Sequence, residues 1–504
     1  MGPRVDAPIP STGEDFRRRF ATHALQFHGK MPGMKASVLR LSSAVLLVTA
    51  VACGSDSAAT VDAPPEVDAA TCTLAGAKVA GTPETNPLSN APAKCGAPAY
   101  VWRKDPDLGA ITERGTRSTY SAAQLAALAT AGNVMLPRVP VHDVALMNVA
   151  YATQDRGTRT TSSATIAFPT NLAVGTKPPL LLLLHGTSGF RRSCGPTSDS
   201  ETQLLGAVFA SLGWVVVMPD YLGLESMGTD YAGPHPYLVG QATAIASLDA
   251  ARAATQLMVT ENICPIQELA VFGGSQGGHA ALWVDRLAPY YAREFELIGT
   301  VATVPPSDLI AHTNRGLRAL VPASANTLAT FVTQAAWYGQ SSKLDQVLKA
   351  PFVTTVPAAL ESTCDPGAAV EPTSLAEVFS DALLTHVASG SLATFPDFGC
   401  MVQENSLVDT SVARITPDSL WYGVLFVLGQ DDTLVDPAIE RASYDKLCAT
   451  GMPLNYLECE GASHTRATAW SIPSIVQFLD DRKAHMPFTK ACTRPAAQRC
   501  PGTP

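Results

Sequence analysis

Short apolar runs recur along the middle of the chain, and stretches with apolar residues at helical spacing separate several of them. The runs are bounded by glycine, proline or polar residues, as is typical of buried strands. They occupy residues 180–184, 214–219, 269–272, 297–304, 424–428 and 455–459. The stretch 238–258, between the second and third runs, has the helical spacing, for example at Ala244 and Leu248. This alternation predicts an α/β fold with a mostly parallel sheet covered by helices on both faces.

Segments at the two ends of this region have a different character. Residues 144–153 and 162–169 are strand-like and are joined by a turn signal at 154–157, so they predict a β-hairpin. A last helix is expected at 475–482, and a loose tail follows it.

The alternation stops after residue 304 and resumes only at about residue 418. Within this interval, residues 327–338 and 375–392 have apolar positions at helical spacing. We therefore predict that residues 306–417 form an inserted, mainly helical cap.

One apolar run ends at a serine enclosed by glycines, Gly273-Gly274-Ser275-Gln276-Gly277, and a second apolar stretch follows it. The pattern is typical of a strand that turns sharply into a helix, where glycines permit the close packing and the serine hydroxyl is exposed. Alone, this G-x-S-x-G match is a weak signal, because loops of small residues produce it by chance.

A serine hydroxyl is a weak nucleophile at neutral pH and needs a histidine base that is oriented by a carboxylate. Two later strands end close to such residues. The loop after 424–428 contains Asp431, Asp432 and Asp436, and His464 follows 455–459. The order serine, aspartate, histidine is the one used by α/β-hydrolases.

These residues make the chain resemble an α/β-hydrolase, and most closely the secretory lipase family, over roughly residues 140–492. The matching segments are His185-Gly-Thr187, Pro219-Asp-Tyr-Leu-Gly223, Gly273 to Gly278, Val304-Pro-Pro-Ser-Asp308, Gly429-x-x-Asp432-x-x-Val435, Gly461-x-x-His464 and Phe478-Leu-Asp-Asp-Arg482. The resemblance implies Ser275 as the nucleophile, Asp432 as the acid and His464 as the base. Asp432 fits better than its two neighbours because it fills the fourth place of G-x-x-D-x-x-V.

The negative charge that develops when serine attacks a carbonyl must be met by N–H donors. Gln276 supplies one backbone N–H by its position after the serine. The resemblance implies Thr187 as the source of the second donor, with Gly186 allowing close approach. His185 and His279 are expected to be structural, whereas Tyr221, His235 and Tyr237 are equally consistent with lining the site and with packing.

The composition excludes other classes of protein. Charged residues make up 16% of the 504 residues, the net charge is −9, and no basic stripe suggests nucleic-acid binding. No dinucleotide-binding or phosphate-binding glycine motif follows a strand, and no cysteine and histidine cluster has zinc spacing, so we expect neither a cofactor nor a metal.

The chain has 11 cysteines, of which ten lie beyond Cys53. In an oxidising compartment these ten are expected to form disulfides, and buried free thiols are the alternative. Proximity in the sequence suggests the pairs Cys364–Cys400 and Cys492–Cys500, although the sequence alone cannot fix the connectivity.

The N-terminal region suggests export. Residues 34–53 begin with a basic segment, continue as an apolar run too short to span a membrane and end in Ala50-Val-Ala-Cys53. They resemble a bacterial lipoprotein signal, in which the cysteine is lipidated, and this implies a membrane anchor at Cys53. An ordinary cleaved signal is the alternative. In either case the protein would be exported, as a cell-envelope lipoprotein or in secreted form.

The predicted organisation follows from these segments. Residues 1–33 are an upstream extension, 34–53 the signal, and 54–94 a flexible tether and early region. The hydrolase core comprises 95–305 and 418–492, interrupted by the cap at 306–417, and a tail occupies 493–504.

The predicted function is a serine-dependent carboxylic ester hydrolase, a lipase or esterase, with triacylglycerols among its candidate substrates. Two alternatives stay open. One is a serine peptidase on the same fold, since the three catalytic residues do not distinguish an ester from an amide. The other is a non-catalytic, surface-binding lipoprotein.

Overall fold

The computed structural model describes residues 72, 74–76, 95, 101–228, 230–365 and 372–504. The predictions for the upstream extension, the signal with Cys53 and most of the tether lie outside these residues. Among the described residues, no helix is long and apolar enough to cross a membrane.

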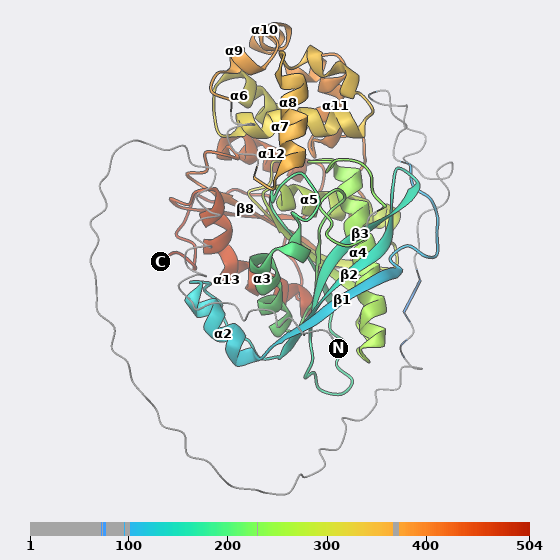
Figure 1. The fold of residues 1–504 in the computed structure, drawn as a ribbon. Coiled ribbons are helices and arrows are strands. Elements are labelled where there is room, and N and C mark those ends of the chain that lie inside the picture. The colour runs from blue at the N-terminus through green and yellow to red at the C-terminus, as the bar shows by residue number, and fades with distance from the viewer. Residues whose placement is uncertain (1–71, 73, 77–94, 96–100, 229, 366–371) are drawn as a thin grey trace, which may run out of the picture.

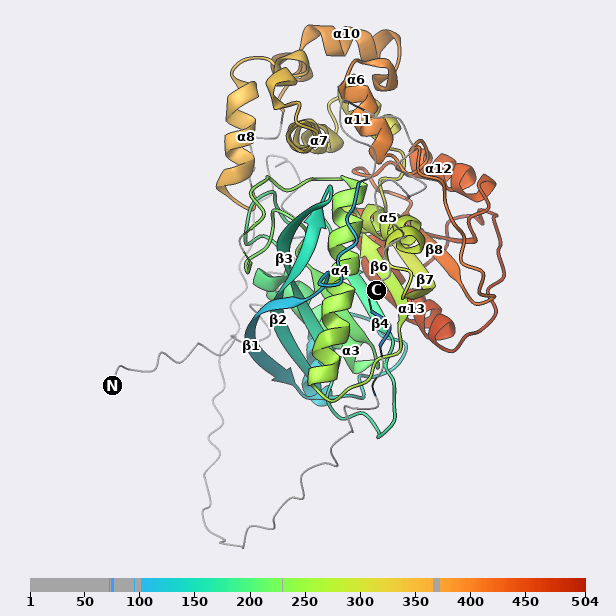
Figure 2. The ribbon, with the colours of Figure 1, turned by 90° about the vertical axis from the view of Figure 1, so that its right-hand side faces the viewer.

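A nine-stranded sheet forms the centre of the molecule (Figures 1 and 2), with the strand order β1-β2-β3-β5-β4-β6-β7-β8-β9. The strands from β5 to β9 in this order are parallel. The pairs β1–β2, β2–β3 and β3–β5 are antiparallel. The strands are β1 (Ile111–Tyr120), β2 (Val144–Asp155), β3 (Thr158–Pro169), β4 (Leu180–Leu184), β5 (Val215–Pro219), β6 (Glu268–Gly274), β7 (Glu296–Thr303), β8 (Gly423–Gly429) and β9 (Leu454–Cys459). The predicted mostly parallel sheet and the β2–β3 hairpin are confirmed.

Helices cover both faces of the sheet, as the sequence predicts. One face packs against α4 (Gly240–Thr260), α5 (Gln276–Tyr291) and α12 (Pro437–Ala449). The other packs against α2 (Ala122–Ala131), α3 (Ser200–Ser211) and α13 (His464–Lys483). All five leucines of β4 are buried, and burial of one leucine side chain contributes roughly 2 kcal/mol. The central strands are thus fixed by apolar packing on both sides.

Helices also make up the described elements between β7 and β8, which lie above one edge of the sheet (Figure 1). They are α6 (Leu309–Arg318), α7 (Ala323–Trp337), α8 (Phe352–Ser362), α9 (Leu375–Val378), α10 (Asp381–Ser389) and α11 (Phe398–Asn405), with 3-10 turns at Ser341–Gln346 and Leu392–Thr394. They have an apolar core of their own, in which Phe331 meets Phe379 and Phe398 edge to face.

Two predicted helices have different bounds. The single helix expected at 375–392 is wrong, because Ser380 caps a new helix at the Leu383 N–H and divides the segment into α9, α10 and a 3-10 turn. The helix expected at 475–482 begins earlier, at His464, and continues through Pro473. His464 is therefore the first residue of α13.

The first strand and helix, β1 and α2, did not emerge from the apolar pattern. Strand β1 lies at the edge of the sheet and is mostly exposed, so its sequence is polar. Helix α2 has only two buried residues, Leu125 and Ala129.

Five disulfides connect the ten cysteines beyond Cys53: Cys72–Cys264, Cys95–Cys400, Cys194–Cys364, Cys448–Cys492 and Cys459–Cys500. Disulfide formation is confirmed, but the two pairings suggested by proximity in the sequence are wrong. Cys364 follows α8 and lies against the loop after β4, whereas Cys400 is in α11. The tail is not loose, because Cys492 is tied to α12 and Cys500 to β9.

Candidate active site

Ser275 occupies the sharp turn between β6 and α5. Its backbone has φ 59° and ψ −122°, a conformation that a non-glycine residue adopts at a cost of about 1–3 kcal/mol. The Ser275 N–H donates to the Thr303 carbonyl of β7 at 2.9 Å, and the Ser275 carbonyl accepts from the His279 N–H at 3.0 Å. The turn is thus held by the neighbouring strand and by the first turn of α5, and the side chain stays partly exposed.

The glycines around Ser275 are required by close packing. A Cβ atom at Gly273 would lie 2.1 Å from the Gly277 carbonyl oxygen, and one at Gly277 would lie 2.0 Å from the Leu184 carbonyl oxygen. Neither position leaves room for a side chain, as the sequence pattern predicts.

Asp432 and His464 lie together at the carboxyl ends of β8 and β9. His464 Nδ1 is 2.7 Å from Asp432 Oδ2, while Asp432 Oδ1 accepts from the Leu434 and Val435 N–H groups at 2.8 and 3.0 Å. The carboxylate is an acceptor, so Nδ1 of the neutral ring carries the hydrogen and Nε2 keeps its lone pair. Of the three candidate aspartates, Asp432 is therefore the one that contacts His464.

The other two aspartates have different surroundings. Asp431 is exposed, and Asp436 caps α12 at the Ala438 N–H and pairs with Arg315 at 3.1 Å.

The N-terminal part of helix α13 lies close to the serine turn. A Cβ atom at Gly274 would lie 3.2 Å from Thr468 Oγ1, and Thr468 follows His464 by one helical turn. Thr468 Oγ1 also lies 2.6 Å from Thr303 Oγ1, next to the carbonyl that holds Ser275. In the described part of the chain, no hydrogen bond joins the Ser275 hydroxyl to His464; in unliganded enzymes such bonds are often long.

The two residues expected to bind a developing oxyanion belong to segments that lie next to Ser275. Gln276 is the first residue of α5, where backbone N–H groups lack partners within the helix. A Cβ atom at Gly186 would lie 3.6 Å from the Ser275 Cβ, so the loop after β4 passes beside the serine. Thr187 follows in this loop, and its hydroxyl lies 3.0 Å from the Tyr237 hydroxyl.

Buried aromatic residues pack against this loop. His185 stacks on Tyr221 at 4.2 Å between ring centroids, and the Tyr221 hydroxyl donates to the His185 carbonyl at 3.1 Å. His235 is also buried; its Nδ1 donates to the Leu222 carbonyl and its Nε2 accepts from the Gln276 side-chain amide, both at 2.8 Å. Tyr221 and His235 are thus buried packing residues that do not line the cavity beside Ser275, whereas Tyr237 lines it.

Burial lowers the pKa of His235 from 6.5 to about 3. The unfolded chain therefore binds a proton at this ring between these two pH values while the folded protein does not, and acid should lower stability in this window. We expect wild type to lose roughly 2.5 kcal/mol more folding free energy than His235→Asn between pH 6 and pH 4, since the full slope is about 1.4 kcal/mol per pH unit. Urea unfolding at several pH values measures this difference, and parallel stability curves would contradict it.

A small cavity of about 50 Å³ opens beside Ser275 and Gln276. Most of its wall is apolar, with polar groups from the helices between β7 and β8. The other lining residues are Tyr237, Leu238, Pro306, Leu309, His312, Thr313, Ala323, Asn326, Thr327, Thr330, Leu434 and Val435.

Sequence reasoning missed one polar pair at this cavity. His312, from α6, lines it, and its Nε2 lies 2.8 Å from Glu440 Oε1 of α12. The two residues are 128 positions apart and belong to no motif, so nothing in the sequence connects them. Of the described residues, His312 and not His464 is the histidine that lines this cavity.

The described residues hold no group of three or more histidine, cysteine, aspartate or glutamate side chains placed to bind a metal ion.

Several known lipases and esterases are similar to this chain in sequence or structure. A probable inactive lipase of Mycobacterium tuberculosis is 23% identical over 348 residues, which are 64% of this chain and 70% of that protein. The ligand-bound rice cell wall degrading esterase LipA of Xanthomonas oryzae superposes with a TM-score of 0.62 at 20% identity, over 75% of this chain and 98% of that one. Candida antarctica lipase A in its closed state has a TM-score of 0.58 at 17% identity, over 84% and 91% of the two chains.

The structural likeness confirms the α/β-hydrolase fold class. In sequence, the model of the secretory lipase family matches residues 196–491, more than half of the chain and the segment that contains Ser275, Asp432 and His464. The chain belongs to the secretory lipase family.

Proposed function

We propose that the protein is a serine-dependent carboxylic ester hydrolase that works through an acyl-enzyme. The observation that carries the proposal is the strained turn of Ser275 at the same edge of the sheet as the His464–Asp432 pair, whose atoms are 2.7 Å apart. Membership of the secretory lipase family supports lipase or esterase chemistry.

In the proposed reaction, Ser275 Oγ attacks the ester carbonyl carbon while His464 Nε2 takes the hydroxyl proton. Collapse of the tetrahedral intermediate breaks the bond to the alcohol oxygen, which leaves with the proton from Nε2. Water then attacks the acyl-enzyme, giving its proton to His464, and the carboxylic acid departs as Ser275 recovers its proton. The first step needs Oγ and Nε2 within hydrogen-bond distance, a contact that often tightens only when substrate binds.

Asp432 has two tasks in this mechanism. It holds the His464 ring in the tautomer with hydrogen on Nδ1, and its charge stabilises the imidazolium that forms when Nε2 is protonated. The Leu434 and Val435 N–H groups fix the carboxylate in turn. The N–H of Gln276 and a donor from Thr187 would bind the oxyanion.

Ester and amide hydrolysis are separated by a substrate panel. Turnover of p-nitrophenyl esters without turnover of aminoacyl-nitroanilides supports the proposal. The opposite result would favour a peptidase on the same fold.

Within the ester series we expect short acyl chains to be preferred. A cavity of about 50 Å³ holds only about three to five water-sized groups, which suits an acyl chain of roughly four carbons. The kcat/KM for p-nitrophenyl butyrate should exceed that for p-nitrophenyl palmitate by at least about tenfold when both esters are dissolved as monomers. An equal or larger value for the palmitate would contradict the expected preference for short acyl chains.

The family and the disulfides fit an exported protein. Lipidation of Cys53, and a membrane anchor there, stay predictions from the sequence.

A further inference from the structure

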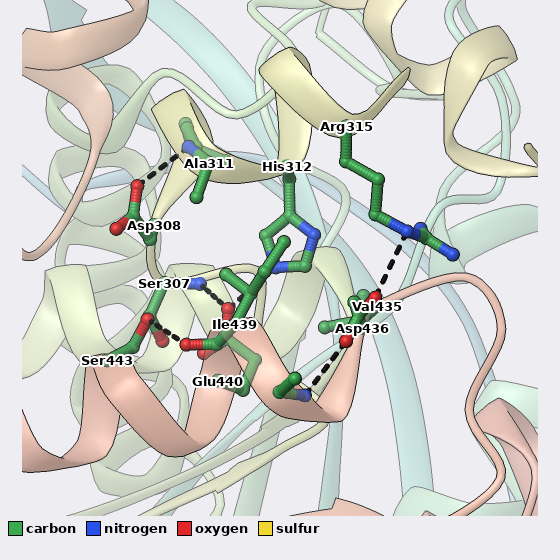
Figure 3. Close-up of polar contacts among 12 residues, drawn as sticks. Ser307, Asp308, Ala311, His312, Arg315, Val435, Asp436, Ile439, Glu440 and Ser443 are labelled. Atoms are coloured by element: carbon green, nitrogen blue, oxygen red, sulfur yellow. Dashed lines mark hydrogen bonds and ion pairs between the residues drawn. The ribbon is translucent and has the colours of Figure 1, made fainter. Parts of the chain in front are cut away.

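Helices α6 and α12 are joined by a row of three polar pairs, which connects the helices between β7 and β8 to the hydrolase core. Figure 3 shows the residues of two of these pairs, His312 with Glu440 and Arg315 with Asp436. The first and last pairs are ion pairs at the ends of the row, and the middle pair is a histidine with a glutamate. The pairs are Asp308–Lys446 at 2.8 Å, His312–Glu440 at 2.8 Å and Arg315–Asp436 at 3.1 Å.

The middle pair differs from the others in its surroundings. The Glu440 side chain is fully buried, and that of His312 is 9% exposed. Of the six residues in the row, only His312 lines the cavity that contains Ser275. Its ring therefore connects a buried carboxylate to the space beside the proposed nucleophile.

The contacts of Glu440 determine how the His312 ring is used. Glu440 Oε1 accepts from the Ser307 N–H at 2.9 Å and faces His312 Nε2 at 2.8 Å. Since a carboxylate only accepts, Nε2 of the neutral ring carries the hydrogen, and Nδ1 keeps its lone pair.

Nδ1 is the ring nitrogen that Glu440 leaves available on a side chain that lines the cavity. Among the described residues it has no hydrogen-bond partner, and it is not one of the fully buried polar atoms that lack one. The neighbouring cavity wall is largely apolar, for example at Leu309 and Val435.

We propose that His312 determines substrate specificity by accepting a hydrogen bond at Nδ1 from a hydroxyl group of the ester. The inference rests on the proposed function and names its substrate class, esters with a hydroxyl group a few carbons from the scissile bond. A plain alkyl group in the cavity would remove water from Nδ1 without replacing its hydrogen bond, and this loss disfavours the alkyl ester. The hydroxyl belongs to the acyl part or to the alcohol part of the ester, and the experiment separates the two.

The test compares two pairs of esters that differ by one hydroxyl group. p-Nitrophenyl 3-hydroxybutyrate is compared with p-nitrophenyl butyrate for the acyl part, and 3-hydroxypropyl butyrate with propyl butyrate for the alcohol part. For wild type, we expect kcat/KM to favour the hydroxylated member of one pair by about tenfold, the value of one good hydrogen bond. The same ratio should fall to about one in His312→Phe and in His312→Leu.

Two further variants separate recognition from a structural role. His312→Gln can donate to Glu440 through its amide nitrogen and accept from the substrate through its oxygen, so it should retain part of the preference. Lys446→Met breaks a neighbouring pair of the same row away from the cavity, and its ratio should equal that of wild type.

Wild-type kcat/KM ratios near one for both pairs of esters would overturn the inference. This outcome is measured on wild type alone and does not depend on whether any variant folds. A preference that survives in both His312→Phe and His312→Leu would overturn it as well. Failure of the proposed function gives a different result, namely no turnover of any of the four esters by wild type.

Discussion

Replacing Ser275 by alanine lowers kcat for p-nitrophenyl butyrate by about a millionfold in this account. The variant keeps the cavity and the His464–Asp432 pair but loses the oxygen that forms the acyl-enzyme, so only binding and oxyanion stabilisation remain. Steady-state kinetics with purified protein measures the loss. Alanine should also fit the serine turn, so the melting temperature should change little.

Ser200 provides the matched control. It is exposed at the start of α3, and Ser200→Ala should keep wild-type kcat. A Ser275→Ala enzyme that is folded and retains most of its esterase activity would contradict the assignment of the nucleophile.

Replacing Asp432 by asparagine should lower kcat by about ten-thousandfold. The asparagine oxygen can still accept from the Leu434 and Val435 N–H groups, but its amide nitrogen then faces His464 Nδ1 at the place of Oδ2. An amide N–H favours the tautomer with the lone pair on Nδ1, and Nε2 then carries a hydrogen and cannot take one from Ser275.

The neighbouring aspartate gives a stringent comparison for this variant. Asp431 is one residue away and exposed, so Asp431→Asn should retain wild-type kcat. Equal losses in the two variants, or a large loss only in Asp431→Asn, would show that the choice among the loop aspartates is wrong.

The parts of the fold that the sequence predicts well are those governed by apolar burial. The run at Leu180–Leu184 has buried side chains on both faces of the sheet, so composition alone marks it as a strand. Strand β1 lies at the edge, where one side is open to water and polar residues such as Glu113 and Arg117 are favourable. Burial leaves no periodic signal there.

Contacts between distant segments limited the prediction elsewhere. Cys364 and Cys400 are consecutive cysteines in the sequence. Each is nevertheless bonded to a cysteine of the first part of the chain, because the helices between β7 and β8 pack onto that part. His312 and Glu440 are likewise joined only by the packing of α6 on α12. Such pairs have no fixed spacing that a sequence pattern could express.

The proposed catalytic residues had a better signal, because each directly follows a strand of a parallel sheet. The carboxyl ends of parallel strands lie along the same end of the sheet. Ser275 after β6, Asp432 after β8 and His464 after β9 are therefore expected to lie close together. The structure gives the contact between Asp432 and His464, and the role of each residue in catalysis is for the variants above to establish.

The proposed function depends on a reactive serine, and one relative, in Mycobacterium tuberculosis, is named a probable inactive lipase. An active serine hydrolase reacts covalently with a fluorophosphonate, because the probe needs an activated serine beside an oxyanion site. Folded wild-type protein should be labelled at Ser275, as located by peptide mass spectrometry, and heat-denatured protein should not. Folded protein that carries no label at Ser275 would contradict the account and favour a binding protein that has kept the hydrolase fold.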